Sequence, residues 1–238
     1  MRELPAAVRP VVDFLNTIDV EDGTDVLRDG PEALANWLVE HGLCAARPSV
    51  TTADVRAAID LRRGLRSLAL ANNGEPVDAE DVQAAQTVPT ALTFRMRLPT
   101  GTDAAGPDLL ADDSGSFSDA LGRIAAAYFT ASVRGGWARV RRCPAHDCAW
   151  VFWDSSKNAS RRWCSMRVCG NRAKKCARST NEERSVPPTL VRGDLSRADL
   201  ALSLVSKRPR KCSSNADPQP RKPVHGAPAS LPPTNSPP

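Results

Sequence analysis

The sequence contains no apolar run long enough for a membrane helix, since none approaches about 18 consecutive apolar residues. The first ten residues, Met1–Pro10, also lack the apolar core of a secretory signal peptide. We therefore expect a cytoplasmic protein that makes no contact with a membrane. Cysteines stay reduced in that compartment, so a cysteine cluster there is more often a metal site than a set of disulfides.

Histidine is also scarce: the chain has three, and none lies near a carboxylate-rich motif. Histidine is the side chain most often used for general acid–base catalysis. The sequence has no phosphate-binding loop, nucleophile elbow or dinucleotide-binding fingerprint. We therefore expect that the protein is not an enzyme and has no catalytic residues.

Aromatic residues are absent from the last part of the chain, residues 185–238, which holds 11 of the 20 prolines. A segment of this composition buries too little apolar area to offset the entropy lost on ordering. The composition predicts a proline-rich disordered tail over 185–238.

Charge divides the rest of the chain into two regions. Residues 1–138 carry 12 basic and 20 acidic side chains, whereas residues 139–184 carry 12 basic and 4 acidic ones. The balance is thus −8 in the first region and +8 in the second. The pattern predicts an acidic domain followed by a small basic module, whose simplest polyanionic partner is nucleic acid.

Four cysteines in the basic module form two pairs with equal spacing. Four residues separate Cys143 from Cys148 and Cys164 from Cys169, and fifteen residues separate the pairs. This arrangement is typical of a structural zinc site, in which each of two tight turns supplies two thiolates. His146 is an alternative ligand to Cys148, iron is an alternative metal, and disulfides or free buried thiols are alternatives to any metal.

Apolar periodicity in residues 11–135 predicts a mainly α domain with a small β element. Thr51 and Asp54 have the spacing of a capping box at the start of a helix. Alternation of apolar and polar residues over 91–98 predicts a half-buried strand, with a partner near Leu109 and Leu110. The helices are expected at 31–41, from 52 to about 71, at 78–86 and at 118–132.

Between the cysteine pairs, Trp150–Trp153 alternates like a strand, and residues 154–158 have the composition of a turn. The three tryptophans of this module either form its miniature core or stack on nucleic-acid bases. After the last cysteine, Gly170 is expected to adopt a positive φ and Asn171 to cap a basic helix. That helix either contacts phosphates or is simply solvated.

One N-terminal motif, Asp13-Phe14-Leu15-Asn16-Thr17, mixes polar and apolar residues without a clear period. Asp13 and Asn16 are candidates for turn or helix-cap formers, and alternatively for ligand-binding residues.

The module from Cys143 to Lys174 resembles the CGNR zinc finger, through its cysteines, the run Arg161-Arg162-Trp163-Cys164 and the run Cys169-Gly170-Asn171-Arg172. That family pairs the finger with an N-terminal ABATE-type domain and is regarded as bacterial transcription regulators. The motif at 13–17 is similar to one near the start of that domain. The resemblance implies zinc on the four cysteines, DNA as the partner and a small-molecule effector for the N-terminal domain.

Together these features predict a DNA-binding transcription regulator with an ABATE-like domain over 1–138 and a finger over 139–184. We expect a homodimer or an effector-binding role for the N-terminal domain. RNA binding is one alternative, and a structural or protein-docking zinc module on a domain of unrecognised activity is another. The residues expected to contact DNA phosphates are Arg161, Arg162, Arg172, Lys174 and Lys175.

Overall fold

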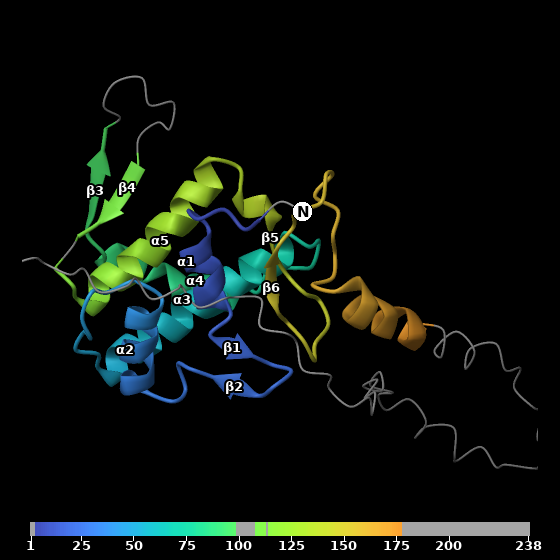
Figure 1. The fold of residues 1–238 in the computed structure, drawn as a ribbon, viewed down its shortest axis with the longest axis horizontal. Coiled ribbons are helices and arrows are strands. Elements are labelled where there is room, and N and C mark those ends of the chain that lie inside the picture. Colours follow the sequence, from blue (N-terminus) through green and yellow to red (C-terminus); the bar gives the residue numbers. More distant parts are fainter. Residues whose placement is uncertain (1–2, 99–107, 113, 178–238) are drawn as a thin grey trace, which may run out of the picture. The chain divides into compact units, whose positions relative to one another are not determined.

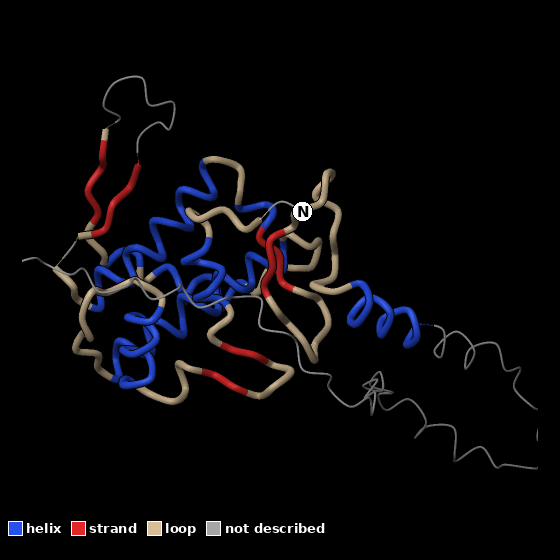
Figure 2. Tube along the Cα trace, in the orientation of Figure 1, coloured by secondary structure: helices blue, strands red, loops and turns tan. Residues whose placement is uncertain are grey.

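The computed structural model describes residues 3–98, 108–112 and 114–177, and Met1–Ala177 form one compact unit (Figures 1 and 2). The α-helices are α1 (Arg9–Leu15), α2 (Pro31–Glu40), α3 (Thr52–Ala71), α4 (Ala79–Gln86) and α5 (Phe117–Val133). Two 3₁₀ turns are η1 (Pro89–Ala91) and η2 (Trp137–Arg139). The π-turn η3 (Met166–Gly170) continues as a helix over residues 171–177. The strands are β1 (Ile18–Asp19), β2 (Thr24–Asp25), β3 (Phe94–Arg97), β4 (Asp108–Ala111), β5 (Val140–Arg142) and β6 (Val151–Trp153).

Within the described residues the strands pair as three separate antiparallel hairpins, β1–β2, β3–β4 and β5–β6. The predicted class, a mainly α domain with small β elements followed by a cysteine-rich module, is therefore confirmed. In this part of the chain no helix combines the length and the apolarity that a membrane crossing requires. The disordered tail predicted for 185–238 lies outside the described residues.

Apolar side chains of α1, α2, α3 and α5 form the main core. Phe14 of α1 is fully buried, and the predicted stripe of α2 places Leu34, Trp37 and Leu38 against the same cluster. The rings of Phe14 and Trp37 lie 6.3 Å apart. Ile124 of α5 is likewise fully buried in this cluster. The short helix α1 thus contributes core side chains between longer helices.

Capping boxes fix the starts of the two longest helices. The Thr51 hydroxyl accepts from the Asp54 N–H, and the Asp54 carboxylate accepts from the Thr51 N–H at 2.8 Å, as the sequence predicts. Ser116 and Asp119 form the same reciprocal pair before α5. This second box was not predicted from the sequence, and it places the start of α5 at Phe117, one residue before the predicted start.

The β3–β4 hairpin is less buried than its alternating pattern predicts. Met96 and Leu98, expected on a buried face, are 68% and 65% exposed. β4 lies against α5: a Cβ on Gly122 would lie 2.8 Å from the Cβ of Ala111, and the Thr130 hydroxyl donates to Asp108 at 3.3 Å. The close approach at Gly122 partly buries Ala111. The expectation of a half-buried strand was wrong for Met96 and Leu98.

The third hairpin, β5–β6, joins the core of the N-terminal helices directly. Val140 and Val151 are buried in the same apolar cluster as Phe14. Trp153 also packs against this cluster, and the Trp137 ring meets Tyr128 of α5 edge-on at 4.7 Å. The core therefore runs continuously from the helices into the hairpin that carries the first cysteine pair.

Candidate metal centre

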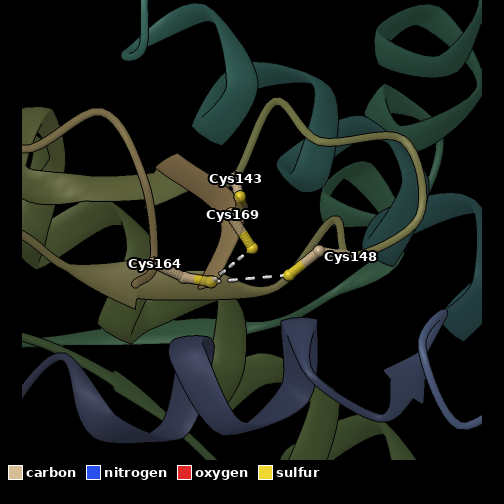
Figure 3. Close-up of side chains that lie close together, drawn as sticks. All are labelled: Cys143, Cys148, Cys164 and Cys169. Atoms are coloured by element: carbon tan, nitrogen blue, oxygen red, sulfur yellow. Dashed lines mark hydrogen bonds between the residues drawn. The ribbon is translucent and has the colours of Figure 1, made fainter. Parts of the chain in front are cut away.

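Four cysteine sulfurs meet in one buried cluster of the finger (Figure 3). Cys143 follows β5, Cys148 precedes β6, Cys164 lies in the loop after β6, and Cys169 lies in η3. Their Sγ atoms all lie within 4.8 Å of one another. The Sγ atom of Cys164 is 3.4 Å from that of Cys148 and 3.6 Å from that of Cys169. The structure thus brings together the four cysteines that the spacing selects.

The cluster has the size and chemistry of a tetrahedral thiolate site. With Zn–S bonds of about 2.3 Å, the sulfurs of such a site lie about 3.8 Å apart. The sulfur–sulfur distances of 3.4 and 3.6 Å, and the 4.8 Å limit for the whole set, fit that tetrahedron. His146, the alternative ligand, has a 64% exposed side chain whose Nδ1 lies 3.7 Å from Asp147. The donor set therefore fits a structural zinc ion held by cysteine alone.

Backbone hydrogen bonds shape the first pair of cysteines into a tight turn. The Cys143 N–H donates to the Trp150 carbonyl at 2.8 Å. The N–H groups of Cys148 and Ala149 both donate to the Ala145 carbonyl, at 3.1 and 2.9 Å. Ala149 has a φ of 50°, a left-handed conformation that alanine seldom adopts. This turn directs both sulfurs to one side of the chain, as metal binding requires.

Ser165, rather than Asn171, caps the helical turn that carries Cys169. The Ser165 hydroxyl accepts from the Val168 N–H at 3.3 Å, and its carbonyl accepts from the Gly170 N–H at 3.1 Å. Asn171 lies inside the helical segment that follows η3. The expectation that Asn171 caps the helix was wrong because the helical segment begins five residues earlier, as a π-turn that contains Cys169.

Gly170 lies where a side chain would crowd its neighbours, whereas a positive φ was predicted for it. Its φ lies outside the left-handed region, unlike that of six other glycines among the described residues. A Cβ at this position would lie 2.4 Å from the Met166 sulfur and 3.2 Å from Cδ1 of Trp163. Glycine therefore allows Met166 and Trp163 to pack directly on the backbone beside Cys169.

The thiols of the cluster perturb one another strongly. For Cys143, a contact with Cys148 raises the pKa, but hydrogen bonds with Cys164 and Cys169 outweigh it, and the pKa falls to about 7. The hydrogen bond with Cys143 lowers the pKa of Cys148 well below its usual range. The hydrogen bond between Cys143 and Cys169 raises the pKa of Cys169 far above its usual range. Full ionisation of four buried thiols requires a cation, and a divalent metal supplies that charge.

A fully buried carboxylate, Asp154, organises the loop between the cysteine pairs. Its oxygens accept from the N–H and hydroxyl of Ser156, at 2.9 and 2.6 Å, and from the Arg161 N–H at 2.8 Å. Burial alone would raise the pKa of Asp154, but these hydrogen bonds, together with the charge of nearby Arg141, lower it. Asp154 therefore fixes the path of the chain from β6 to Cys164.

Several of the cations predicted to contact DNA are engaged within the protein, including Arg161, Arg162 and Arg172. The Arg161 guanidinium donates to the carbonyls of Trp163 and Cys164 and lies 4.9 Å from the centre of the Phe152 ring. Arg162 donates to Glu75 at 2.6 Å. Arg172 donates to Asp147 and lies 3.5 Å from Glu21. Lys174 and Lys175 lie exposed on the helical segment 171–177.

The motif at residues 13–17 supplies a contact between the N-terminal domain and the finger. The Asn16 side chain donates to the Val151 carbonyl at 2.8 Å and accepts from the Val151 N–H at 2.9 Å. It thus pairs with β6 as a neighbouring strand would. Asp13 lies half-buried in α1. Ligand binding by Asp13 and Asn16 stays a prediction, but for Asn16 the structure shows a positioning role.

Further contacts of this kind come from α3 and its end, and the sequence analysis did not identify them. The Asn72 amide donates to the carbonyls of Trp137 and Val140, at 2.8 and 2.9 Å. The Asn73 amide donates to the carbonyls of Arg142 and Arg162, at 3.0 and 2.6 Å. The sequence predicts only that the helix ends near residue 71, because it does not show which backbone groups the next two side chains face.

Arg66 of α3 makes the most buried of these contacts. It is 7% exposed, and its guanidinium donates to the carbonyls of Leu15 and Ala149. Burial lowers the pKa of Arg66 to about 9, with the charges of Arg142 and Arg62 adding to the effect, so the group stays charged at neutral pH. Arg66 therefore joins the end of α1 to the residue that follows Cys148.

Two family models match the chain, and the boundary between them coincides with the change from the acidic to the basic region. The ABATE model, described as "Putative stress-induced transcription regulator", matches residues 8–136. The CGNR zinc finger model matches residues 139–180, which include all four clustered cysteines. Both are families of regulators or zinc fingers, not of enzymes. A search of the curated proteins returns no match to the chain.

Proposed function

The chain belongs to the ABATE family and carries a CGNR zinc finger, and on that basis we propose that it is a transcription regulator that binds DNA through the finger. The observation that carries this proposal is the charge of the finger region, +8 over residues 139–184 against −8 over residues 1–138. A basic segment of this kind neutralises DNA phosphates, and such contacts supply a large share of the affinity of DNA-binding proteins.

The helical segment that leaves the metal centre is the element proposed to contact the duplex. Residues 166–177 project from the rest of the finger in Figure 1, and Lys174 and Lys175 are exposed on them. A bound zinc ion would fix the start of this helix through Cys169, without taking part in any reaction. Arg161 is better assigned to holding the Cys164 turn, since its guanidinium is occupied by backbone carbonyls.

The N-terminal domain is proposed to position the finger and to transmit the binding of a small-molecule effector. Asn16, Arg66, Asn72 and Asn73 donate to carbonyls on the finger side of the chain, and Asn16 also accepts from its backbone. A shift of α1 or α3 would therefore move the finger. Effector binding and homodimer formation stay predictions, and neither is needed for the proposed DNA contact.

The double substitution Lys174→Gln and Lys175→Gln is expected to weaken the binding of any duplex sequence and to reduce its salt dependence. Each lost phosphate contact lowers the slope of log K against log salt by about 0.9, so the pair should lower it by about 2. The measurement is a salt series of fluorescence-anisotropy titrations on the zinc-loaded chain with random duplex DNA. Arg47→Gln with Arg56→Gln, two cations of the N-terminal domain, is the matched control. Equal slopes for all three proteins would remove Lys174 and Lys175 from the interface.

The substitution Glu75→Gln is expected to strengthen DNA binding. Glu75 holds Arg162 at 2.6 Å, and the two side chains are 32% and 56% exposed. Release of this arginine offers one more cation to the phosphates, worth about a 2- to 5-fold gain in affinity. The same titrations measure the gain, and Glu32→Gln, which removes a partner of Arg47, is the control for lost negative charge. An equal gain for both variants would show only a general charge effect.

A further inference from the structure

A pocket of about 450 Å³ lies on the finger, outside the cysteine cluster. Its volume is within the range of about 300–1,000 Å³ that is usual for small-molecule sites. The pocket is lined by Ser156, Ser160, Arg161, Arg162, Trp163 and Met166.

Two apolar side chains, Trp163 and Met166, line the pocket. Trp163 is half-buried, and its ring packs against the cysteine cluster, which limits its movement. Met166 is 50% exposed, and it shares with Trp163 the space above Gly170. The glycine thereby lets the two side chains form one continuous surface. Aromatic and thioether groups together make a surface suited to a flat π-system.

The rim of the pocket is cationic. The guanidinium carbon of Arg162 lies 5.8 Å from the centre of the Trp163 ring, and its side chain is 56% exposed. The Arg161 guanidinium is directed to the carbonyls of Trp163 and Cys164. Arg162 pairs with Glu75 at 2.6 Å, so an anionic group beside an occupant of the pocket would compete with that carboxylate for the Arg162 guanidinium.

We propose that this pocket binds an unpaired nucleobase, stacked on Trp163, with the adjoining phosphate on Arg162. The inference rests on the proposed nucleic-acid function and adds that the finger binds single-stranded or locally melted DNA in preference to a closed duplex. A flat ring next to a phosphate is the unit that single-stranded nucleic acid repeats, and every base offers a π-face for such stacking. A paired base inside a duplex cannot reach the pocket without leaving its stack.

The test compares three fluorescein-labelled probes on the zinc-loaded full chain: a random 16-nucleotide DNA strand, its duplex, and the same strand with abasic positions. The intact strand is expected to bind more tightly than the abasic strand by about 5- to 140-fold, which at about 1.4 kcal/mol per tenfold corresponds to the roughly 1–3 kcal/mol of one stacked base. Trp163→Ala should reduce this ratio to about one.

A second variant covers the case in which Trp163→Ala disturbs the cysteine cluster. Ser160 is exposed and lines the pocket, and Ser160→Leu narrows the pocket while leaving Trp163 in place. It should abolish the preference for the intact strand and keep one equivalent of zinc. Trp150→Phe is the control, because Trp150 packs on the cysteines without lining the pocket. Equal binding of intact and abasic strands, or an unchanged ratio in Ser160→Leu, would overturn the inference while leaving duplex binding intact. Failure of all three probes to bind would overturn the proposed function as well.

Discussion

Chelation of the metal is expected to unfold the finger and to lower the melting temperature of the N-terminal domain in the same transition. Structural zinc contributes about 10–16 kcal/mol of apparent folding free energy in isolated fingers. In this chain the hairpin that carries Cys143 and Cys148 also contributes Val140 and Val151 to the core around Phe14. Loss of the finger therefore exposes core side chains of the helices.

The measurement is thermal unfolding followed by circular dichroism, before and after removal of the metal by a strong chelator. Elemental analysis of the starting protein is expected to show one zinc per chain, and iron instead would identify the alternative metal for four thiolates. Cys164→Ser should reproduce the effect of chelation. Cys44→Ala is the matched control, since Cys44 is buried but lies outside the cluster. A helical transition that stays at the same temperature without metal would show that the two parts fold independently.

Features that depend on neighbouring residues were predictable from the sequence. The capping box at Thr51 and the stripe on α2 need only a few consecutive positions to be recognised. The four cysteines are also local, because each tight turn supplies two sulfurs and the equal spacing identifies the set. The fold class and the candidate ligand set followed from these patterns.

Features that depend on distant contacts were not predictable. Asn73 has the composition of a helix end, yet its amide donates to carbonyls of Arg142 and Arg162, 69 and 89 positions away. Met96 alternates like a buried residue, but no helix among the described residues covers that part of β3. For Gly170, a structural need for glycine was expected from the sequence but was explained by a positive φ. Its neighbours Met166 and Trp163, rather than its own φ, require glycine.

Substitution of the buried arginine, Arg66→Met, is expected to destabilise the zinc-loaded protein by about 2–5 kcal/mol. Methionine has a similar length but leaves the carbonyls of Leu15 and Ala149 without their donor. An unsatisfied buried polar group costs about 1–3 kcal/mol. Relief of the cost of burying the guanidinium, which lowers the pKa of Arg66 to about 9, offsets part of this loss. Loss of the two hydrogen bonds is expected to outweigh that relief, because both bonds are buried.

Urea denaturation of the zinc-loaded protein measures this effect, and Arg63→Met is the matched control on the same helix. Arg63 is 57% exposed and pairs with Asp81, so its loss should cost less than about 1 kcal/mol. Arg66→Met should also weaken zinc binding, since the carbonyl released at Ala149 belongs to the turn that carries Cys148. A variant as stable as the native protein, with unchanged zinc affinity, would show that Arg66 only fills space. A variant with lower stability and lower zinc affinity would instead show that α3 supports the metal centre through Arg66. An effector bound to the N-terminal domain would need such a link to act on the finger.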